Sequence, residues 1–561
     1  MAFRKRAVFP ESNGQPISKQ KKSSFQCKTL AYCLTVRFRV CILIACAMLI
    51  MQYANLCIAV SIIAMVKAPS SLSTENTTSN PISFIDSFNQ SGKTNAANQS
   101  VPLELNHITQ LNWINSSNNS LIVINNDGLD WSAAVQGMVL SAFNWGRVAS
   151  PLGGILVDKA NAKHCLTVAI ILLALTASLV PPAAYWSVYA VVAARMVAGL
   201  VDAVAQPATN KLISTWFPPK ERSMTISITT GGRQVAIFVG YPIAGYFCSN
   251  PQLMGGWPLA FHFTAVLTAL WIPFWCLLTS NDPAQAYGIT PAEVAKITAQ
   301  AGPKTTKSPT NLRIASTSSL PETRKPNTTS DQKQKPSHRS IPWRFILLSP
   351  VVWADIMAVV CREMPLFVVF LFLPTFMADV QKASVGSSAS LGGIPAAAFL
   401  VAKILASRLY QSTLKYVRIE LTLAVKIFNA IGCLGLGVLL FTISLLPCSC
   451  PTITLTCFVA AVAFCGFHNP GCCSTPVLIA PKYSGTVSGL MFSCISIGSL
   501  LTPIIVKNIA TSGFRSEWNI VLQIFGTISL LPLIFFNIWG SADLQPWNDG
   551  DPRQKKKTTS S

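Results

Sequence analysis

Long apolar runs separated by shorter polar stretches are the main pattern along this chain. Each run holds about 20 apolar residues, the length that a helix needs to cross the hydrocarbon core of a bilayer. The runs lie at residues 40–66, 134–157, 165–183, 186–212, 224–247 and 258–279, and then at 345–378, 389–410, 424–446, 453–476, 486–510 and 518–540. The pattern predicts an all-α polytopic membrane protein with 12 transmembrane helices in two six-helix halves.

The composition excludes two other classes of protein. Of 561 residues, 51% are hydrophobic and only 11% are charged, whereas about a quarter are charged in soluble domains. Even so, 43 Lys and Arg outnumber 21 Asp and Glu, which gives a formal net charge of +22. A disordered chain would be less apolar, and a nucleic-acid-binding domain gathers its basic residues on one folded face.

The positive charges outside the apolar runs predict the orientation in the membrane. Segment 1–39 holds nine basic residues and one acid, linker 281–344 holds ten basic residues and four acids, and four basic residues lie in tail 541–561. Basic flanks stay in the cytoplasm. We therefore expect a cytoplasmic tail at 1–39, helical halves at 40–279 and 345–540, and a cytoplasmic linker at 280–344 that is mostly without fixed structure. The tail 541–561 is also expected in the cytoplasm.

Loop 67–130 is expected on the opposite, lumenal or extracellular side, because its acids outnumber its basic residues. It also carries N-x-S/T glycosylation sequons, at Asn76, Asn89, Asn98, Asn115 and Asn118. The sequon at Asn327 lies in the linker and is expected to be unused. Whether Cys248, Cys448 and Cys450 near helix ends form a disulfide is left open by the sequence.

Charged residues inside the apolar runs indicate function, because a charge within a membrane helix is costly and usually marks a pathway. The basic ones outnumber the acids. They are Arg147, Arg195, Lys211, Arg233, Arg362 and Lys403, against Asp202, Asp355 and Glu363. An anion entering the protein would supply the missing negative charge, and the planar guanidinium of Arg suits carboxylate or phosphate.

These residues are not all expected in one site. Lys211 and Lys403 are expected nearer the cytoplasmic side. Asp355 is expected to face that side too, and Glu363 to point away from its neighbour Arg362. His468 is expected to be a packed polar residue, so it is left out of the site with the two acids.

A loop motif follows the second predicted helix. The stretch Gly154-Ile-Leu-Val-Asp158-Lys159-Ala-Asn161-Ala-Lys163 resembles the signature G-x-x-x-D-[RK]-x-G-x-[RK] of the major facilitator superfamily. Glycine permits close helix approach, and the acid and bases can form a charge latch at a helix end. Asn161 replaces the second glycine, and Asn also tolerates a left-handed backbone.

Further stretches, in matching order, resemble the anion:cation symporter branch, solute carrier family 17, which includes sialin, type I sodium–phosphate cotransporters and vesicular glutamate transporters. They are Trp131–Gly137, Ser141–Gly146, Arg195–Gly199, Trp216–Ser223, Ile341–Trp343, Ala480–Gly485 and Gly540–Asn548. The resemblance implies the superfamily fold.

The resemblance also implies roles for individual residues. Arg195 and Arg362 are expected to hold the substrate anion in a central cavity. Arg147 and Arg233 are further candidates because they lie within the apolar runs. The alternative for these arginines is a structural ion pair or a side chain that reaches to a helix end. Asp202 is expected to couple transport to protons; the alternative is a structural partner for Arg233 or Lys211.

One departure from the branch bears on these roles. Sialin-like members have an Arg late in the first helix, but residues 52–57 contain no basic residue. Arg147 stands where the branch usually has Tyr. This suggests the hypothesis that Arg147 supplies the missing cation.

The predicted function is secondary active transport of an organic or inorganic anion such as sialic acid, glutamate, phosphate or urate, as symport or potential-driven uniport. Alternating access would be coupled to H⁺ or Na⁺. The alternative is a transport-inactive sensor or scaffold. No catalytic cluster, metal spacing or P-loop is visible, so neither an enzyme nor a cofactor is expected. The expected partners are the anion and the bilayer, with no nucleic acid. The protein is expected to be a monomer in the plasma membrane or in a lysosomal or vesicular membrane. The sequence leaves open which anion is carried, which ion is coupled and which membrane holds the protein.

Overall fold

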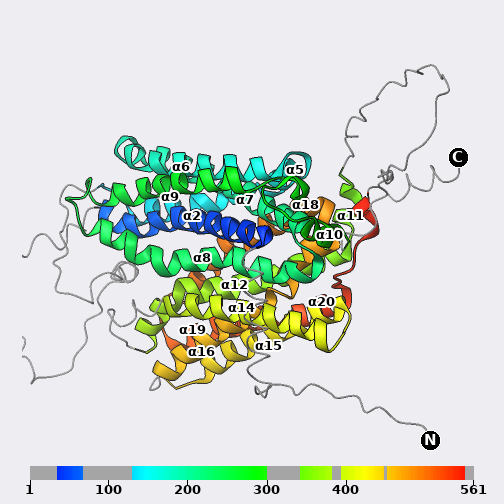
Figure 1. Cartoon of the computed structure of the whole chain (residues 1–561). Helices are drawn as coiled ribbons and strands as arrows, with labels where there is room; N and C mark the ends of the chain where they lie inside the picture. The colour runs from blue at the N-terminus through cyan, green and yellow to red at the C-terminus, as the bar shows by residue number, and fades with distance from the viewer. Residues whose placement is uncertain (1–34, 67–128, 300–340, 382–392, 448–450, 550–561) are drawn as a thin grey trace, which may run out of the picture.

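The computed structural model describes residues 35–66, 129–299, 341–381, 393–447 and 451–549, and this part of the chain is mostly helical (Figure 1). The helices before the linker are α2 (Val36–Met65), α4 (Ala133–Arg147), α5 (Ser150–Lys159), α6 (Ala162–Trp186), α7 (Val188–Trp216), α8 (Pro219–Cys248) and α9 (Trp257–Leu278). Those after it are α12 (Pro350–Asp379), α14 (Gly393–Tyr416), α15 (Leu421–Leu445), α16 (Pro451–Cys465), α17 (Thr475–Ile479), α18 (Ser484–Ile509), α19 (Arg515–Leu530) and α20 (Pro532–Trp539).

Over the residues that the structure describes, each of the 12 predicted spans falls on one helix or on a run of shorter helices. In the described part, 10 helical segments are long and apolar enough to cross a membrane. The other two spans are α4–α5, which is interrupted, and α8, which carries Glu221 and Arg222 in its first turn and Arg233 near its middle. The prediction of an all-α polytopic membrane protein is confirmed.

Proline and glycine account for the interrupted spans, since proline removes a helical hydrogen-bond donor and clashes with the preceding turn. The run 134–157 divides between α4 and α5, where Pro151 begins the second piece. The run 453–476 leaves α-helical geometry around Pro470 and Gly471, and α20 begins at Pro532. At the break between α4 and α5, the Val148 carbonyl oxygen accepts a hydrogen bond from Ser493 Oγ of α18 at 2.7 Å, so a neighbouring side chain satisfies a backbone group there.

Helix starts are set by residues that bond to exposed backbone N–H groups. Ser132 begins α4, Ser187 begins α7 and Asn161 begins α6, each through its side-chain oxygen. Asn161 has φ −84°, so its tolerance of a left-handed backbone is not used. The departure from the superfamily motif therefore serves as a helix cap.

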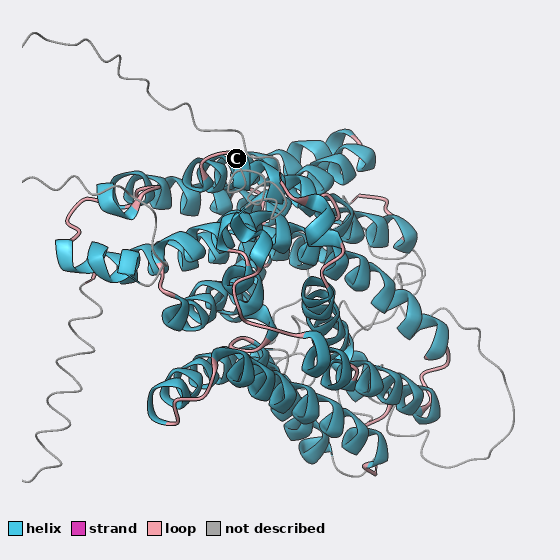
Figure 2. Ribbon diagram, turned by 90° about the vertical axis from the view of Figure 1, so that its right-hand side faces the viewer, coloured by secondary structure: helices cyan, strands magenta, loops and turns pink. Residues whose placement is uncertain are grey.

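The helices form two groups that meet along a few pairs. α2 and α4–α9 pack together, and α12–α20 form the second group (Figure 1). Figure 2 shows the helical bundle turned by 90° from that view. The groups meet where α5, α4 and α7 contact α18, and where α8 contacts α14. Two short helices, α10 (Pro291–Ala299) and α11 (Trp343–Leu347), lie at one end of the bundle, which we call the linker end (Figure 1).

The first part of the linker is ordered, which composition did not predict. In α10, the buried Glu293 accepts hydrogen bonds from the backbone N–H and the Nε of Arg37, at 3.1 and 3.0 Å. Glu221 of α8 pairs with Arg37 Nη1 at 2.5 Å and with Lys296 of α10 at 2.8 Å. The ion pairs fasten α10 to the starts of α2 and α8.

Several predictions lie outside the described residues. These include the five sequons of loop 67–130, most of the N-terminal tail, the C-terminal residues from 550 on, Cys448 and Cys450. Cys248 is a free thiol, with its Sγ 3.7 Å from Ser61 Oγ. The domain boundaries and the sidedness of the membrane stay predictions.

Candidate functional site

A carboxylate shared by two arginines lies in the core of the first helical group. Asp202 of α7, 2% exposed, has its Oδ2 3.1 Å from Arg147 Nε and its Oδ1 2.8 Å from Arg233 Nη2. Arg147 comes from the end of α4 and Arg233 from the middle of α8. Asp202 is therefore a partner of Arg233, as one reading of the sequence held, and of Arg147 as well.

Arg233 also has neutral partners. Its Nη1 donates to Gln52 Oε1 of α2 at 3.1 Å. With the Gln206 amide oxygen turned toward it, that oxygen accepts from Arg233 Nε at 3.1 Å and from Nη2 at 2.8 Å. The guanidinium is thus held by one charged and two neutral side chains.

Arg195 has no acidic partner among the described residues. It is buried, at 4% exposed, and its Nη2 donates to Asn55 Oδ1 of α2 at 2.7 Å. Its guanidinium carbon lies 5.1 Å from the centre of the Phe143 ring, and that of Arg147 lies 5.9 Å from the same ring. Its Nε lacks a hydrogen-bond partner. Where sialin-like members carry a basic residue, α2 thus supplies two neutral acceptors, Gln52 and Asn55.

Arg362 of α12 is paired with its own neighbour. It is buried, its Nη2 contacts Glu363 Oε1, and its Nε lacks a hydrogen-bond partner in the described part. The expectation that Glu363 points away from Arg362 is wrong, because two long side chains on adjacent positions can bend toward each other. Asp355 is fully buried, and neither of its carboxylate oxygens has a hydrogen-bond partner among the described residues.

Lys403 lies deeper than expected. It is 2% exposed, on α14, and its Nζ reaches across to α8, where it bonds Thr230 and Gln234. Because Gln234 follows Arg233 directly, Lys403 lies at the depth of Arg233 and away from the linker end. By contrast, Lys211 lies at the linker end, beside Asp158 and Lys482.

The centre of the described bundle carries an excess of positive charge. Its five cations are Arg147, Arg195, Arg233, Arg362 and Lys403, against the three acids Asp202, Glu363 and the buried Asp355, of which only Asp202 and Glu363 form ion pairs with them. Buried charges are stable only when they are paired. The arrangement favours entry of an anion and disfavours entry of a cation.

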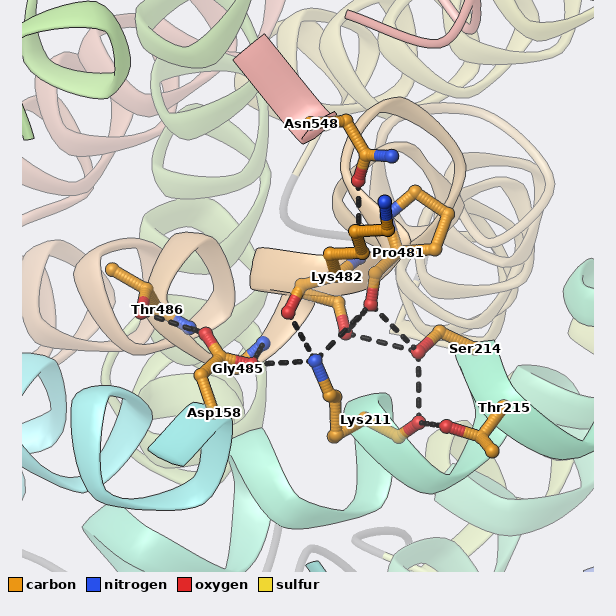
Figure 3. Close-up of polar contacts among 10 residues, drawn as sticks. Asp158, Lys211, Ser214, Thr215, Pro481, Lys482, Gly485, Thr486 and Asn548 are labelled. Atoms are coloured by element: carbon orange, nitrogen blue, oxygen red, sulfur yellow. Dashed lines mark hydrogen bonds and ion pairs between the residues drawn. The ribbon is translucent and has the colours of Figure 1, made fainter. Parts of the chain in front are cut away.

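At the linker end, Asp158 of α5 forms a latch between the two groups (Figure 3). Its Oδ1 accepts from the backbone N–H of Gly485 at 3.2 Å, and its Oδ2 accepts from the N–H and Oγ1 of Thr486 at 2.6 and 2.7 Å. These donors form the start of α18, which favours a carboxylate. Lys211 Nζ lies 2.9 Å from Asp158 Oδ1 and also contacts the Lys482 carbonyl oxygen.

Glycine makes this latch possible. A Cβ placed on Gly154 would lie 2.3 Å from the carbonyl oxygen of Gly485, so α5 and α18 approach closer than any side chain allows. Lys163 Nζ donates to the carbonyl oxygens of Cys276 and Thr279, at 3.1 and 2.6 Å, at the end of α9. Lys159 is exposed. The motif therefore makes two contacts. Asp158 joins the two helical groups at the start of α18, and Lys163 joins α6 to the end of α9 within the first group.

Residues 108–503 match the family model described as Major Facilitator Superfamily. The chain belongs to this superfamily. It is therefore a multi-pass membrane transporter and not an enzyme, as the sequence predicted.

Similar proteins include transporters of the branch that the motifs resemble. The uncharacterized transporter slc-17.2 of Caenorhabditis elegans is 28% identical over 424 residues, which cover 74% of this chain and 80% of that protein. Sialin of Ovis aries is 25% identical, with 75% and 78% covered, and vesicular glutamate transporter 2 of Bos taurus is 25% identical, with 76% and 68% covered. These matches confirm the resemblance.

Solved structures confirm the fold of this superfamily member. The proton:xylose symporter XylE, bound to 6-bromo-6-deoxy-D-glucose, aligns with a TM-score of 0.58 at 13% identity, covering 91% of this chain and 98% of that one. A likeness at that identity extends to the fold alone.

Sequence reasoning found the charged members of the site but not their neutral partners. Arg147, Arg233 and Asp202 stand out as charges in apolar runs, and the structure brings them together. Gln52 and Asn55 were missed as binding partners, although two polar residues three apart in the apolar run of α2 were a usable signal.

Proposed function

We propose that this transporter carries an anion across its membrane by alternating exposure of a site between its two helical groups. The observation that carries the proposal is the excess of buried cations over carboxylates in the middle of the bundle. An anion bound there would lower the cost of burying that excess. The names of similar proteins agree, since they include vesicular glutamate transporters and a probable anion transporter of Arabidopsis thaliana at 28% identity.

Arg195 and Arg362 are the proposed principal contacts for the anion. Each is buried and has an Nε without a hydrogen-bond partner, so each keeps a free donor for a carboxylate or phosphate oxygen. They come from the two different helical groups, α7 and α12. An anion bound by both arginines would link the two helical groups. Such a site suits alternating access, in which movement of one group against the other changes the side of the membrane to which the site is open.

Asp202 is the proposed coupling residue, with Arg147 and Arg233 as its charged partners. Protonation of Asp202 would release two guanidinium groups that it now holds at 2.8 and 3.1 Å. Binding of a proton at Asp202 would thereby make two cations available to the anion. This linkage favours symport of H⁺ with the anion, while Na⁺ and the membrane potential are the alternatives for the test.

The latch at Asp158 supports the alternating-access part of the proposal. It fastens α5 to the start of α18 at the linker end, and the buried Arg222 of α8 adds a bond across the groups to the Val477 carbonyl oxygen at 2.6 Å. These contacts must open when the site faces the linker end. The described conformation is therefore the one closed at that end.

Uptake into proteoliposomes tests the proposal. The purified chain is supplied with labelled phosphate, urate, sialic acid, glutamate or ATP, each with and without a Na⁺ gradient, a pH gradient and an imposed potential. We expect saturable uptake of at least one anion that is driven by one of these gradients. If correctly folded protein takes up none of them, the proposal fails and the scaffold alternative is supported.

A further inference from the structure

Lys403 occupies an unusual environment for a lysine. Its side chain is almost fully buried, and its Nζ donates to Thr230 Oγ1 at 2.9 Å and to Gln234 Oε1 at 2.6 Å. The Phe399 ring centre lies 5.2 Å away. An ammonium group has three donors, and these two bonds use two of them. All of its close partners are electrically neutral.

The charged surroundings make this position more costly. Arg362 of α12 and Arg233 of α8 are the cations close enough to act electrostatically on Lys403, and the Cys473 thiol acts on it in the opposite sense. In the described part of the chain, Arg233 is paired with Asp202 and Arg362 with Glu363, but no carboxylate oxygen lies within 4.0 Å of Lys403 Nζ. Lys403 is therefore the member of this trio that lacks a carboxylate partner of its own in the described part of the chain.

Lys403 lies at one end of a polar stripe between the two helical groups. On α8, Ser223, Ser227, Thr230 and Gln234 recur at helical spacing and so share one face. Ser407, one turn after Lys403 on α14, lies 3.1 Å from Ser223 Oγ and 2.6 Å from Ser227 Oγ. The serine pairs hold α8 against α14 on the side nearer the linker end. Lys403 comes next along this interface, on the side away from the linker end.

We propose that Lys403 is an anion-binding residue of the transport site, so that α14 contributes to substrate recognition together with Arg233 and Arg362. The ligand is a compact anionic group, a carboxylate or a phosphate, which would accept from the unused donor of Nζ or replace Gln234. The inference rests on the proposed function and adds a residue that the charge pattern had assigned to the cytoplasmic side.

The contact with Gln234 gives this site a link to conformational change. Gln234 belongs to the first helical group and Lys403 to the second. An anion that replaces Gln234 removes a bond across the groups and leaves Lys403 attached to substrate instead. Binding of substrate at Lys403 therefore weakens the contact between α8 and α14 at this depth.

The test compares thermal unfolding of the full-length protein in detergent with and without anion. The probes are the sodium salts of inorganic phosphate, glutamate and sialic acid, with sodium chloride at equal ionic strength and uncharged sorbitol as references. The variants are Lys403→Gln and Lys403→Arg. The matched control is Lys426→Gln, since Lys426 on α15 is partly exposed and its Nζ donates only to the Asn537 carbonyl oxygen, at 2.8 Å.

We expect Lys403→Gln without anion to unfold at the same or a higher temperature than the wild type, because the variant no longer buries an unpaired charge. The rise in unfolding temperature that the effective anion gives the wild type should be lost in Lys403→Gln, partly restored in Lys403→Arg and unchanged in Lys426→Gln. Uptake of that anion should show about a tenfold higher KM in Lys403→Gln, as for loss of one charged hydrogen bond.

Two results overturn the inference while leaving the proposed function intact. One is an anion-dependent rise in Lys403→Gln that equals that of the wild type. The other is a lower unfolding temperature of Lys403→Gln without anion, together with an unchanged KM, which marks a structural lysine. If the wild type itself shows neither stabilisation nor uptake with any anion, the proposed function is contradicted, and the inference about Lys403 is contradicted with it.

Discussion

Arg147 and Asp202 form a buried ion pair between α4 and α7, with Nε 3.1 Å from Oδ2. The same carboxylate holds Arg233 of α8 at 2.8 Å. One acid thus neutralises two bases, and the two kinds of substitution are not equivalent. Removal of the acid leaves two guanidinium groups without a carboxylate partner, whereas removal of Arg147 leaves a balanced pair.

We expect Asp202→Asn to abolish the response of anion uptake to an imposed pH gradient, because the amide cannot take up a proton from either side. The variant should also lose about 3–5 kcal/mol of stability, the usual cost of breaking a buried pair from one side. Uptake in proteoliposomes at fixed potential, with and without the pH gradient, checks the first outcome. Equal stimulation of wild type and Asp202→Asn by that gradient contradicts the coupling role.

Arg147→Gln tests whether a cation on α4 replaces the basic residue that sialin-like members carry on the first helix. The Arg233–Asp202 pair survives this change, so stability should fall much less than in Asp202→Asn. The KM for the anion should rise by about tenfold to a hundredfold, the cost of one or two charged hydrogen bonds. An unchanged KM and maximal rate would show that Arg147 serves only to hold Asp202.

The sequence predicted the helices and the charged residues of the site because both depend on features that a linear pattern carries. Twenty apolar residues specify a span wherever they pack, and a charge within such a span must find a partner. Arg147, Arg233 and Asp202 were identified for that reason, and the structure joins them.

Which residues become partners was not predictable in the same way. Neutral polar residues such as Gln52, Asn55 and Gln234 have no charge from which the type of partner could be predicted. Their contacts also join helices that are distant in sequence. The depth of Lys403 was misjudged because position along a helix does not show which neighbouring helix it faces. The order of α10 depends on Glu293 meeting Arg37, 256 positions away.

The latch residues Asp158 and Lys211 should differ in importance. Asp158 accepts from three donors at the start of α18 besides its ion pair with Lys211. Lys211→Ala leaves those three bonds in place, but Asp158→Ala removes all of them and leaves the Lys211 ammonium without its carboxylate. We expect Asp158→Ala to reduce uptake at least about tenfold and Lys211→Ala less, taking about 1.5–3 kcal/mol per charged hydrogen bond. Initial rates of uptake at equal protein content measure the order, and the reverse order contradicts this account.

The close approach of α5 and α18 predicts the effect of a single methyl group. In Gly154→Ala the new Cβ would lie 2.3 Å from the Gly485 carbonyl oxygen and 3.0 Å from Thr486 Cα, so backbone must move and the bonds of Asp158 to α18 must lengthen. We expect a lower unfolding temperature and a loss of transport comparable with that of Asp158→Ala. Gly137→Ala on α4 is the matched control, because nothing lies within 4 Å of a Cβ there. It should keep full uptake and gain about 0.5–1 kcal/mol of stability from the better helix former. Full uptake by Gly154→Ala would show that the two helices need not approach this closely for transport.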